Sequence, residues 1–511
     1  MTKYFLTIDN GGTNTKAIIF NDHGDQMGSV AFPTPRIEEQ AGFHEIDLNE
    51  SWGSISNAIN KVIAKSGITN DEIAGISCVG HGKGLYALDK DHKIFMHGIL
   101  STDSRALSLA ERFENKVSDI YPISHQHVME TQSPVLLRWL KDHKRQDYDQ
   151  IGTILAAKDY IRFRLTDNVN QEYGDASGNN FVDLDKQAYS KELFDFFGIP
   201  EMFDKMPSLK KFSDFCGGVT PQAAKETGLK EGTPVYAGMF DIDACSLATG
   251  VLNDDYFSSI VGTWNINVFP SKTRADQDSG LMNSIYPTGS NLVEASSATS
   301  AGNLDIMIKT LMSEEIKNAT AHSRSIYDVL EEFLDHTDAT FTKTIFFPFL
   351  YGSNVAPDAE GSFIGIQSST TKSAMIRSVY EGIIFAHRYH IEKLLKVADH
   401  KPKAIRISGG GTNSKAWVQM FADALGLPIE TVKGSELGGL GGAMASAVGT
   451  GLYANIDEAV KHMSQLKDRV EPDEQQYKIY TQKYDVYLDL LHTLDHGWAK
   501  LRNMQERIGQ L

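Results

Sequence analysis

The sequence predicts an α/β protein made of two similar domains, each headed by a strand hairpin with Gly and Thr in its turn. The segment DNGGTNTKAII (9–19) follows an apolar run, and SSIVGTWNINVF (258–269) repeats the order of strand, Gly-Thr turn and strand. A domain-sized stretch separates the two hairpins. We therefore expect one domain over residues 1–250 and the other over 251–511.

Composition excludes several classes of protein. The chain has 511 residues, 41% of them hydrophobic, which is enough for two cores. A net charge of -17 argues against binding to nucleic acid, which needs a basic face. The three cysteines lack a CxxC spacing and suit a reducing compartment. The first residues run directly into a strand, and no apolar run reaches the roughly 20 residues of a membrane span. We expect a cytoplasmic protein without a membrane partner.

The first hairpin belongs to a predicted three-strand meander. Apolar Tyr4–Ile8, β-branched 15–20 and the run 26–32 read as strands. In a dinucleotide-binding loop the glycines open a helix, whereas here a strand follows, and the Walker spacing is also missing. Converging amides and Thr hydroxyls in such a turn can hold phosphate. An ordinary tight turn is the alternative.

Two further strand ends carry polar or glycine-rich segments. ISGGGTNSKAW (407–417) follows an apolar strand and opens a helix over 414–425, whose first amides suit an anion or an adenosine. The apolar strand 235–239 ends just before Asp241, where open α/β sheets place residues that contact ligands. The alternative is that Asp241 only caps the helix that starts near Ile242.

These turns, in this order, resemble the FGGY family of carbohydrate kinases. The resemblance covers nearly the whole chain, although Ser101 stands where the family usually has tryptophan. It implies two actin-like (ribonuclease H-like) ATPase domains around a central cleft. The segments that carry it are 41–52, 75–91, 99–106, 156–166, 237–250, 346–357 and 409–426.

The resemblance implies transfer of the ATP γ-phosphoryl group to a sugar hydroxyl. Asp241 is the implied catalytic base, with Asp243 as the nearby competitor, and Asp9 is expected beside Mg²⁺ through water. ATP and Mg²⁺ are the implied cofactors. The residues implied for nucleotide binding are Asp9, Gly11, Gly12, Thr13, Asn14, Lys16, Gly262, Thr263, Gly409, Gly410, Gly411 and Ser414. The residues implied for sugar binding are Gly82, Lys83, Asp103, Asp241 and Trp264.

The identity of the sugar depends on finer features. HGKGL (81–85) and SPVLLRWLKDH (133–143) are most similar to the L-xylulose kinases of the family. They imply a ketopentose, L-xylulose in preference to D-xylulose, D-ribulose or a polyol such as erythritol. The alternative class is an actin-like ATPase that acts with a protein partner. The expected partners are the sugar and ATP, without nucleic acid, and a homodimer is the default assembly.

Three other patterns are expected to be structural. The small-residue helix over 436–451 should pack tightly on a sheet without chemistry of its own. His387 and His390 are spaced like a metal pair but lack a third ligand with suitable spacing. The stretch after Asp457 predicts one long amphipathic helix that covers the second domain.

Overall fold

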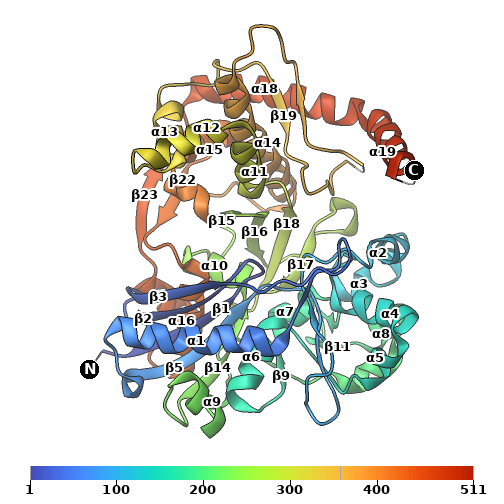
Figure 1. The fold of residues 1–511 in the computed structure, drawn as a ribbon, viewed down its shortest axis with the longest axis vertical. Coiled ribbons are helices and arrows are strands. Elements are labelled where there is room, and N and C mark those ends of the chain that lie inside the picture. Colours follow the sequence, from blue (N-terminus) through green and yellow to red (C-terminus); the bar gives the residue numbers. More distant parts are fainter. Residues whose placement is uncertain (1, 357, 510–511) are drawn as a thin grey trace. The chain divides into compact units, whose positions relative to one another are not determined.

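The computed structural model describes residues 2–356 and 358–509, which form two compact units (Figure 1). Pro357, the last residue of the 346–357 segment, lies outside the described residues. The first unit comprises 2–252, 270–293 and 434–465. The second comprises 253–269, 294–433 and 466–509. Each unit is interrupted in sequence by segments of the other.

The first unit is built on a six-stranded sheet. Its strands, in spatial order, are β13 (Phe215–Gly218), β14 (Pro234–Phe240), β5 (Ile73–Gly80), β1 (Tyr4–Asn10), β2 (Asn14–Asn21) and β3 (Gln26–Pro33). Antiparallel pairing of β1 with β2 and of β2 with β3 confirms the predicted meander. β5 runs parallel to both β1 and β14. The carboxyl ends of β1, β5 and β14 therefore meet at one edge of this sheet.

A bulge interrupts β14 shortly before Asp241. The register against β5 shifts between Tyr236 and Met239. Gly238 lies in this bulge with φ 73°, and a Cβ there would collide with the carbonyl oxygen of Cys78. Only glycine meets both conditions without strain. The glycine thus lets β14 end at the sheet edge immediately before Asp241.

Two helices cover opposite faces of this sheet (Figure 1). α1 (Leu48–Ser66), capped by Asp47, packs on β2 and β3, whereas α16 (Leu437–Gly449) packs on β1, β5 and β14. Leu6 and Ile8 face the α1 side, and Thr7 faces α16, as the period of two in a strand requires. A Cβ on Gly442 would collide with Thr7, which explains the small residues of α16. The prediction that this helix packs tightly on a sheet is confirmed.

The first unit has a second core beside the sheet, around α4 (Ser133–His143). Its other helices are α2 (Leu107–Glu114), α3 (Tyr121–Ser124), α5 (Arg145–Gln150), α6 (Ala157–Thr166), α7 (Tyr173–Gly178), α8 (Lys191–Phe196), α9 (Pro221–Thr227), α10 (Asp241–Ala248) and α17 (Ile456–Met463). Its short strands are β4 (Glu45–Ile46), β6 (Tyr86–Leu88), β7 (Gly98–Ile99), β8 (Thr153–Leu155), β9 (Asn170–Glu172), β10 (Val182–Asp183), β11 (Ala188–Tyr189), β12 (Ser208–Lys210) and β17 (Met282–Ile285).

The second unit repeats the plan of the first. Its adjacent strands are β16 (Asn265–Ser271), β15 (Tyr256–Val261), β21 (Ala404–Ser408), β22 (Ile429–Val432) and β23 (Leu466–Val470). β15 and β16 form an antiparallel hairpin, and β21 runs parallel to β15, as β5 does to β1. The duplicated hairpin architecture is thereby confirmed. Its other elements are β18 (Asn291–Ser297), β19 (Ile345–Phe347), β20 (Ser362–Ile364), α11 (Ala301–Leu311), α12 (Ser313–Ala321), α13 (Ile326–Asp335), α14 (Lys372–Val397), α15 (Lys415–Leu425), α18 (Glu474–Thr493) and α19 (Asp495–Gly509).

The single long helix expected after Asp457 is wrong. The chain forms α17, the edge strand β23, α18 and α19 in turn. β23 pairs antiparallel with β22, and Arg469 of β23 donates to Glu430 at 2.7 Å. Its charged side chains suit an edge strand, which is open on one side. Pro472 then precedes α18, where a helix cannot continue upstream.

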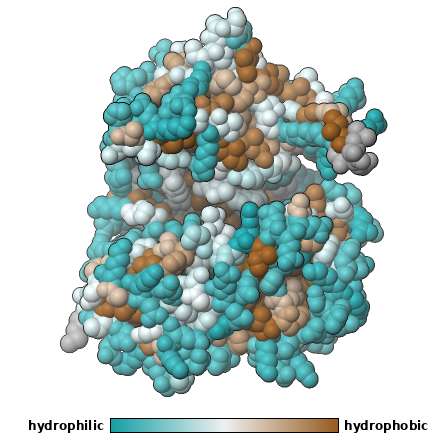
Figure 2. Space-filling model, in the orientation of Figure 1, coloured by the Kyte–Doolittle hydropathy of each residue, from teal (hydrophilic) through white to brown (hydrophobic). Residues whose placement is uncertain are grey.

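The surface agrees with the acidic composition. Figure 2 shows hydrophilic side chains over most of the visible face of each unit, with only scattered hydrophobic residues. Scattered exposed apolar residues are ordinary for a folded chain. Among the described residues, no helix is long and apolar enough to cross a membrane.

Candidate active site

The shared strand edge of the first unit brings two carboxylates together. Asp9 lies near the end of β1 and Asp241 follows β14 as the first residue of α10, and both are half-buried. Burial raises the pKa of Asp241 to about 8, and the negative charges of Asp9 and Asp175 add to the rise, while Lys83 opposes it. The pKa of Asp9 is raised to about 6, chiefly by burial. The edge thus concentrates negative charge and favours a bound cation.

The competing carboxylate, Asp243, lies in a different environment. Its side chain is fully buried, and a Cβ on Gly174 would lie 2.7 Å from one of its oxygens. Asp243 therefore faces the interior of the unit, whereas Asp241 is partly open to solvent. α10 begins at Asp241 with Phe240 as its N-cap, and a hydrogen bond from the backbone N–H of Ile242 to the Asp241 carboxylate opposes the rise of its pKa. Asp241 is thus not the N-cap residue of α10.

The turn after β1 presents backbone amides and hydroxyls. Gly11 donates its N–H to the carbonyl oxygen of Asn14 at 3.1 Å, and Thr34 Oγ1 donates to the carbonyl of Gly11 at 2.8 Å. These bonds fix the turn, while Thr13 and Asn14 remain exposed. A fixed turn with exposed donors suits an anion.

Lys16 has a partner that sequence analysis did not anticipate. Its ammonium donates to Glu436 at 2.6 Å, and the two side chains are 29% and 18% exposed. Glu436 precedes α16, in which Gly438 approaches Asp9 so closely that a Cβ there would lie 3.2 Å from Asp9 Oδ2. The small-residue helix therefore lies beside Asp9, and the expectation that it has no chemistry of its own stays a prediction. No local pattern joins residues so far apart in the chain.

The turn after β5 places Lys83 beside Asp241. Lys83 has φ 64°, which is unusual for a residue with a side chain. A Cβ on Gly82 would collide with the ring of Phe240, the residue before Asp241. On the other side, a Cβ on Gly84 would lie 2.5 Å from the carbonyl oxygen of Ile99. Lys83 therefore supplies the only extended side chain of the 82–84 turn.

His81, in the same turn, is a neighbour that the sequence analysis missed. It is buried, with Nε2 3.1 Å from the Tyr86 hydroxyl and Nδ1 3.3 Å from the carbonyl oxygen of Gly82. Burial lowers its pKa to about 4. A neutral imidazole fixed at both nitrogens holds the turn in place.

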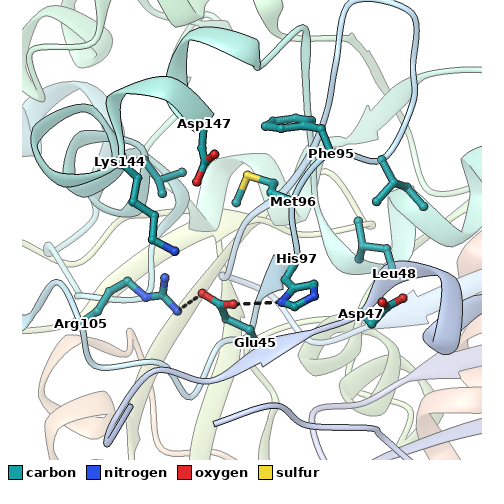
Figure 3. Close-up of a pocket in the computed structure, with 11 residues that line it drawn as sticks. Glu45, Asp47, Leu48, Phe95, Met96, His97, Arg105, Lys144 and Asp147 are labelled. Atoms are coloured by element: carbon teal, nitrogen blue, oxygen red, sulfur yellow. Dashed lines mark hydrogen bonds and ion pairs between the residues drawn. The ribbon is translucent and has the colours of Figure 1, made fainter. Parts of the chain in front are cut away.

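Asp103, expected to contact the sugar, is engaged inside the first unit. It is 1% exposed and accepts from the backbone N–H of His44 at 2.7 Å and from Arg105 at 2.8 Å. Arg105 also pairs with Glu45 at 2.8 Å, and Glu45 contacts His97 at 3.2 Å. Figure 3 shows Arg105, Glu45 and His97 among the residues that line a pocket of about 430 Å³. The hydrogen bonds make Asp103 a brace for the 42–45 segment, and its contact with sugar stays a prediction.

A buried network of charges lies behind Asp241. Lys158, fully buried, donates to Asp175 at 2.9 Å and to Asp159 at 3.1 Å, and lies 3.8 Å from Glu172. Burial raises the pKa of Glu172 to about 7. Because Asp175 acts on the pKa of Asp241, the network contributes to the electrostatics of the site.

In the second unit, the two glycine turns lie against each other. Gly409 has φ 91°, and a Cβ there would lie 2.6 Å from the carbonyl oxygen of Val261, just before Gly262. A Cβ on Gly411 would lie 2.5 Å from Val261 Cγ1. Gly410 is exposed, with open space around it. The predicted helix is confirmed as α15.

The other residues predicted around these turns differ in exposure. Ser414 is the N-cap of α15, where its hydroxyl accepts from the N–H of Trp417 at 3.0 Å. Thr263 is exposed and Trp264 is half-buried. A Cβ on Gly302 would lie 3.0 Å from Thr263 Cγ2. Each turn thus leaves an exposed residue, Thr263 or Gly410, while the backbone beneath is closely packed.

Replacing Gly409 by alanine is expected to lower the free energy of unfolding by about 2–4 kcal/mol, because the new Cβ meets backbone and the φ is unfavourable. ATP affinity should fall with it. The matched control is Gly410→Ala, which has open space and should change the melting temperature little. Thermal unfolding and calorimetric titration with ATP measure both effects. Equal stability of the two variants would contradict this account of the turn.

Comparison with known proteins identifies the chain. Models of the N-terminal and C-terminal domains of the FGGY family of carbohydrate kinases match residues 4–248 and 257–450. The L-xylulose/3-keto-L-gulonate kinase of Escherichia coli is 31% identical over 98% of this chain and 99% of its own. A probable L-xylulose kinase of Haemophilus influenzae is 33% identical over 96% and 99%. The crystal structure of a Lactobacillus acidophilus xylulose kinase superposes with a TM-score of 0.88 at 22% identity, covering 98% and 100%.

The fold is the two-domain actin-like ATPase fold of sugar kinases, as the sequence predicts. The chain belongs to the FGGY family of carbohydrate kinases. It is therefore an ATP-dependent sugar kinase that uses a small sugar and ATP, and the predicted enzyme class is confirmed.

Proposed function

We propose that this kinase phosphorylates a hydroxyl of L-xylulose with Asp241 as the base. The observation that carries the proposal is the half-buried Asp241 carboxylate at the end of β14, flanked by the Lys83 turn. The Haemophilus influenzae relative, named for L-xylulose, and the Escherichia coli relative, named for both L-xylulose and 3-keto-L-gulonate, support the choice of sugar. D-xylulose is the second candidate, because a Bacillus subtilis xylulose kinase is 26% identical over 97% of this chain.

In this mechanism, Asp241 accepts the proton of the sugar hydroxyl as that oxygen attacks the γ-phosphorus of ATP; the bond from the γ-phosphorus to the β,γ-bridging oxygen breaks, and ADP leaves. A carboxylate with a raised pKa is a stronger base than an ordinary one, and it suits this task near pH 8. The Lys83 ammonium donates to sugar oxygens. We assign the turn residues Gly11, Gly12 and Thr13 to phosphate oxygens. In the second unit we assign Gly262 and Thr263 to phosphate and Gly409–Gly411 to adenosine.

The donor set fits Mg²⁺. Asp9 and Asp241 offer oxygen ligands in a region of unbalanced negative charge, since Lys16 already pairs with Glu436. In the described part of the chain, no cluster of three or more potential metal ligands occurs. That agrees with an ion held by one or two carboxylates, water and substrate phosphates. Bound there, Mg²⁺ would neutralise phosphate charge, and Asp9 would hold it through water.

The test is a coupled assay of ADP release with a panel of sugars, compared by kcat/KM. The panel contains L-xylulose, D-xylulose, D-ribulose, erythritol and 3-keto-L-gulonate. L-Xylulose is expected to give the highest value. A higher value with D-xylulose would replace L-xylulose as the proposed substrate. ADP release stimulated only by a protein partner would reject sugar phosphorylation by this chain.

A further inference from the structure

A segment that no motif singles out lies against the Lys83 turn. The N–H of Gly84 donates to the carbonyl oxygen of Thr131 at 2.7 Å, and Ser133 Oγ donates to the carbonyl of Gly84 at 2.6 Å. The backbone N–H of Ser133 also donates to Asn179 Oδ1 at 3.2 Å. The backbone before α4 is thus fixed beside the turn, and it presents Glu130.

Glu130 and Lys83 lie near enough for the charge of Lys83 to act on Glu130, and they form no ion pair in the described part of the chain. Both are half-buried, and within the described residues neither side chain has a hydrogen-bond or ion-pair partner on another residue. Burial raises the pKa of Glu130, the positive charge of Lys83 opposes the rise, and the negative charge of Asp103 adds to it. A half-buried charge without a partner is costly unless a ligand or water supplies the missing hydrogen bonds.

The turn connects this pair to the reacting group. Gly82 contacts Phe240, which precedes Asp241, while Gly84 contacts the segment that carries Glu130. The turn that carries Lys83 thus touches the residue before Asp241 on one side and the segment of Glu130 on the other, and the charge of Lys83 acts on the pKa of both carboxyl groups. A sugar that reaches Asp241 and Lys83 thus comes close to Glu130.

Resting on the proposed function, we propose that Glu130 is a specificity-determining residue that restricts the substrate to uncharged ketoses and rejects sugar acids. Its carboxylate accepts hydrogen bonds from sugar hydroxyls. A carboxylate on the substrate would meet the charges of Glu130 and Asp241, with Lys83 as the single cation of the turn. Like charges in a partly desolvated pocket repel strongly, and such repulsion is a common source of specificity.

The test compares L-xylulose with 3-keto-L-gulonate, a sugar acid, in the full-length enzyme at pH 8. Glu130→Gln removes the charge at constant shape. The ratio of kcat/KM for the acid to that for L-xylulose should rise roughly tenfold or more. Glu111→Gln is the matched control. Glu111 is an exposed residue of α2, and its negative charge also raises the pKa of Glu130, but it does not belong to the 130–133 segment that contacts the Lys83 turn. That variant should leave the ratio within about twofold.

The outcomes decide whether Glu130 determines specificity or has only a structural role. A ratio that is unchanged in Glu130→Gln, or an equal loss for both sugars with a lower melting temperature, would overturn the proposal and leave Glu130 a structural residue. Lys83→Met should lower kcat/KM for L-xylulose and for 3-keto-L-gulonate, with the larger loss for the acid. If the wild-type enzyme phosphorylates neither sugar, the proposed substrate is wrong. The Glu130 proposal is then decided with the neutral ketose that the panel identifies and its sugar acid, by the same ratio.

Discussion

Replacing Asp241 by asparagine is expected to lower kcat by about 10³-fold or more, because the amide keeps the shape of the side chain but cannot accept the hydroxyl proton. Binding of ADP should remain close to normal. A coupled assay of ADP release gives kcat, and calorimetric titration gives the nucleotide affinity. The matched control is Asp243→Asn, since Asp243 lies two residues on and faces the interior. Near-normal turnover in Asp241→Asn with a large loss in Asp243→Asn would exchange their roles.

The same substitution should stabilise the ligand-free enzyme at alkaline pH. The pKa of Asp241 is about 8 in the folded chain and near 4 when unfolded, so between these values the folded state binds more protons. Stability therefore falls as pH rises through this window. Asparagine removes the effect, and the gain should reach about 1–3 kcal/mol at pH 8 and vanish below pH 4. Thermal unfolding at pH 4 and 8 measures it, and a gain independent of pH would contradict the assignment.

Those parts of the fold that local patterns encode could be predicted from the sequence. The strand–turn–strand hairpins at 9–19 and 258–269 follow from apolar runs interrupted by glycine, and the placement of Asp241 follows from the end of an apolar strand. The helix at 415–425 follows from its N-cap, Ser414. Each of these signals lies within about ten residues of chain, where propensity and turn chemistry act.

The parts that were missed come from residues far apart in the chain. Lys16 and Glu436 come from the first and the last segment of chain in the first unit. Glu130 lies near the Lys83 turn because the N–H of Gly84 donates to the carbonyl oxygen of Thr131. No period or spacing encodes such meetings. The long helix expected after Asp457 failed for a related reason, because pairing of β23 with β22 outweighs the helical pattern of a charged segment. Tertiary contacts decide where local preference is weak.

The buried charges behind the site also depend on tertiary placement, and they carry the second large prediction. Lys158 pairs with Asp159, Asp175 and Glu172, all of them buried, and Arg162 is a second partner of Asp159 at 2.7 Å. Lys158→Met should lower the free energy of unfolding by about 3–5 kcal/mol, because it leaves the buried carboxylates of Asp175 and Glu172 without this counter-ion. The surface control Lys186→Met, which breaks a pair with Asp183 at 2.7 Å, should cost about 1 kcal/mol or less.

The pH dependence separates loss of charge from loss of packing. Without Lys158, the carboxyl groups of Asp175 and Glu172 should have still higher pKa values in the folded chain, and a folded state that binds extra protons loses stability as pH rises. The destabilisation should therefore be larger at pH 8 than at pH 5, as measured by urea unfolding. Adding Asp175→Asn, which removes one of the unpaired charges, should recover part of the loss at pH 8. A cost that is equal at both pH values, and unrelieved in the double variant, would mean that Lys158 acts through its packing and not through its charge.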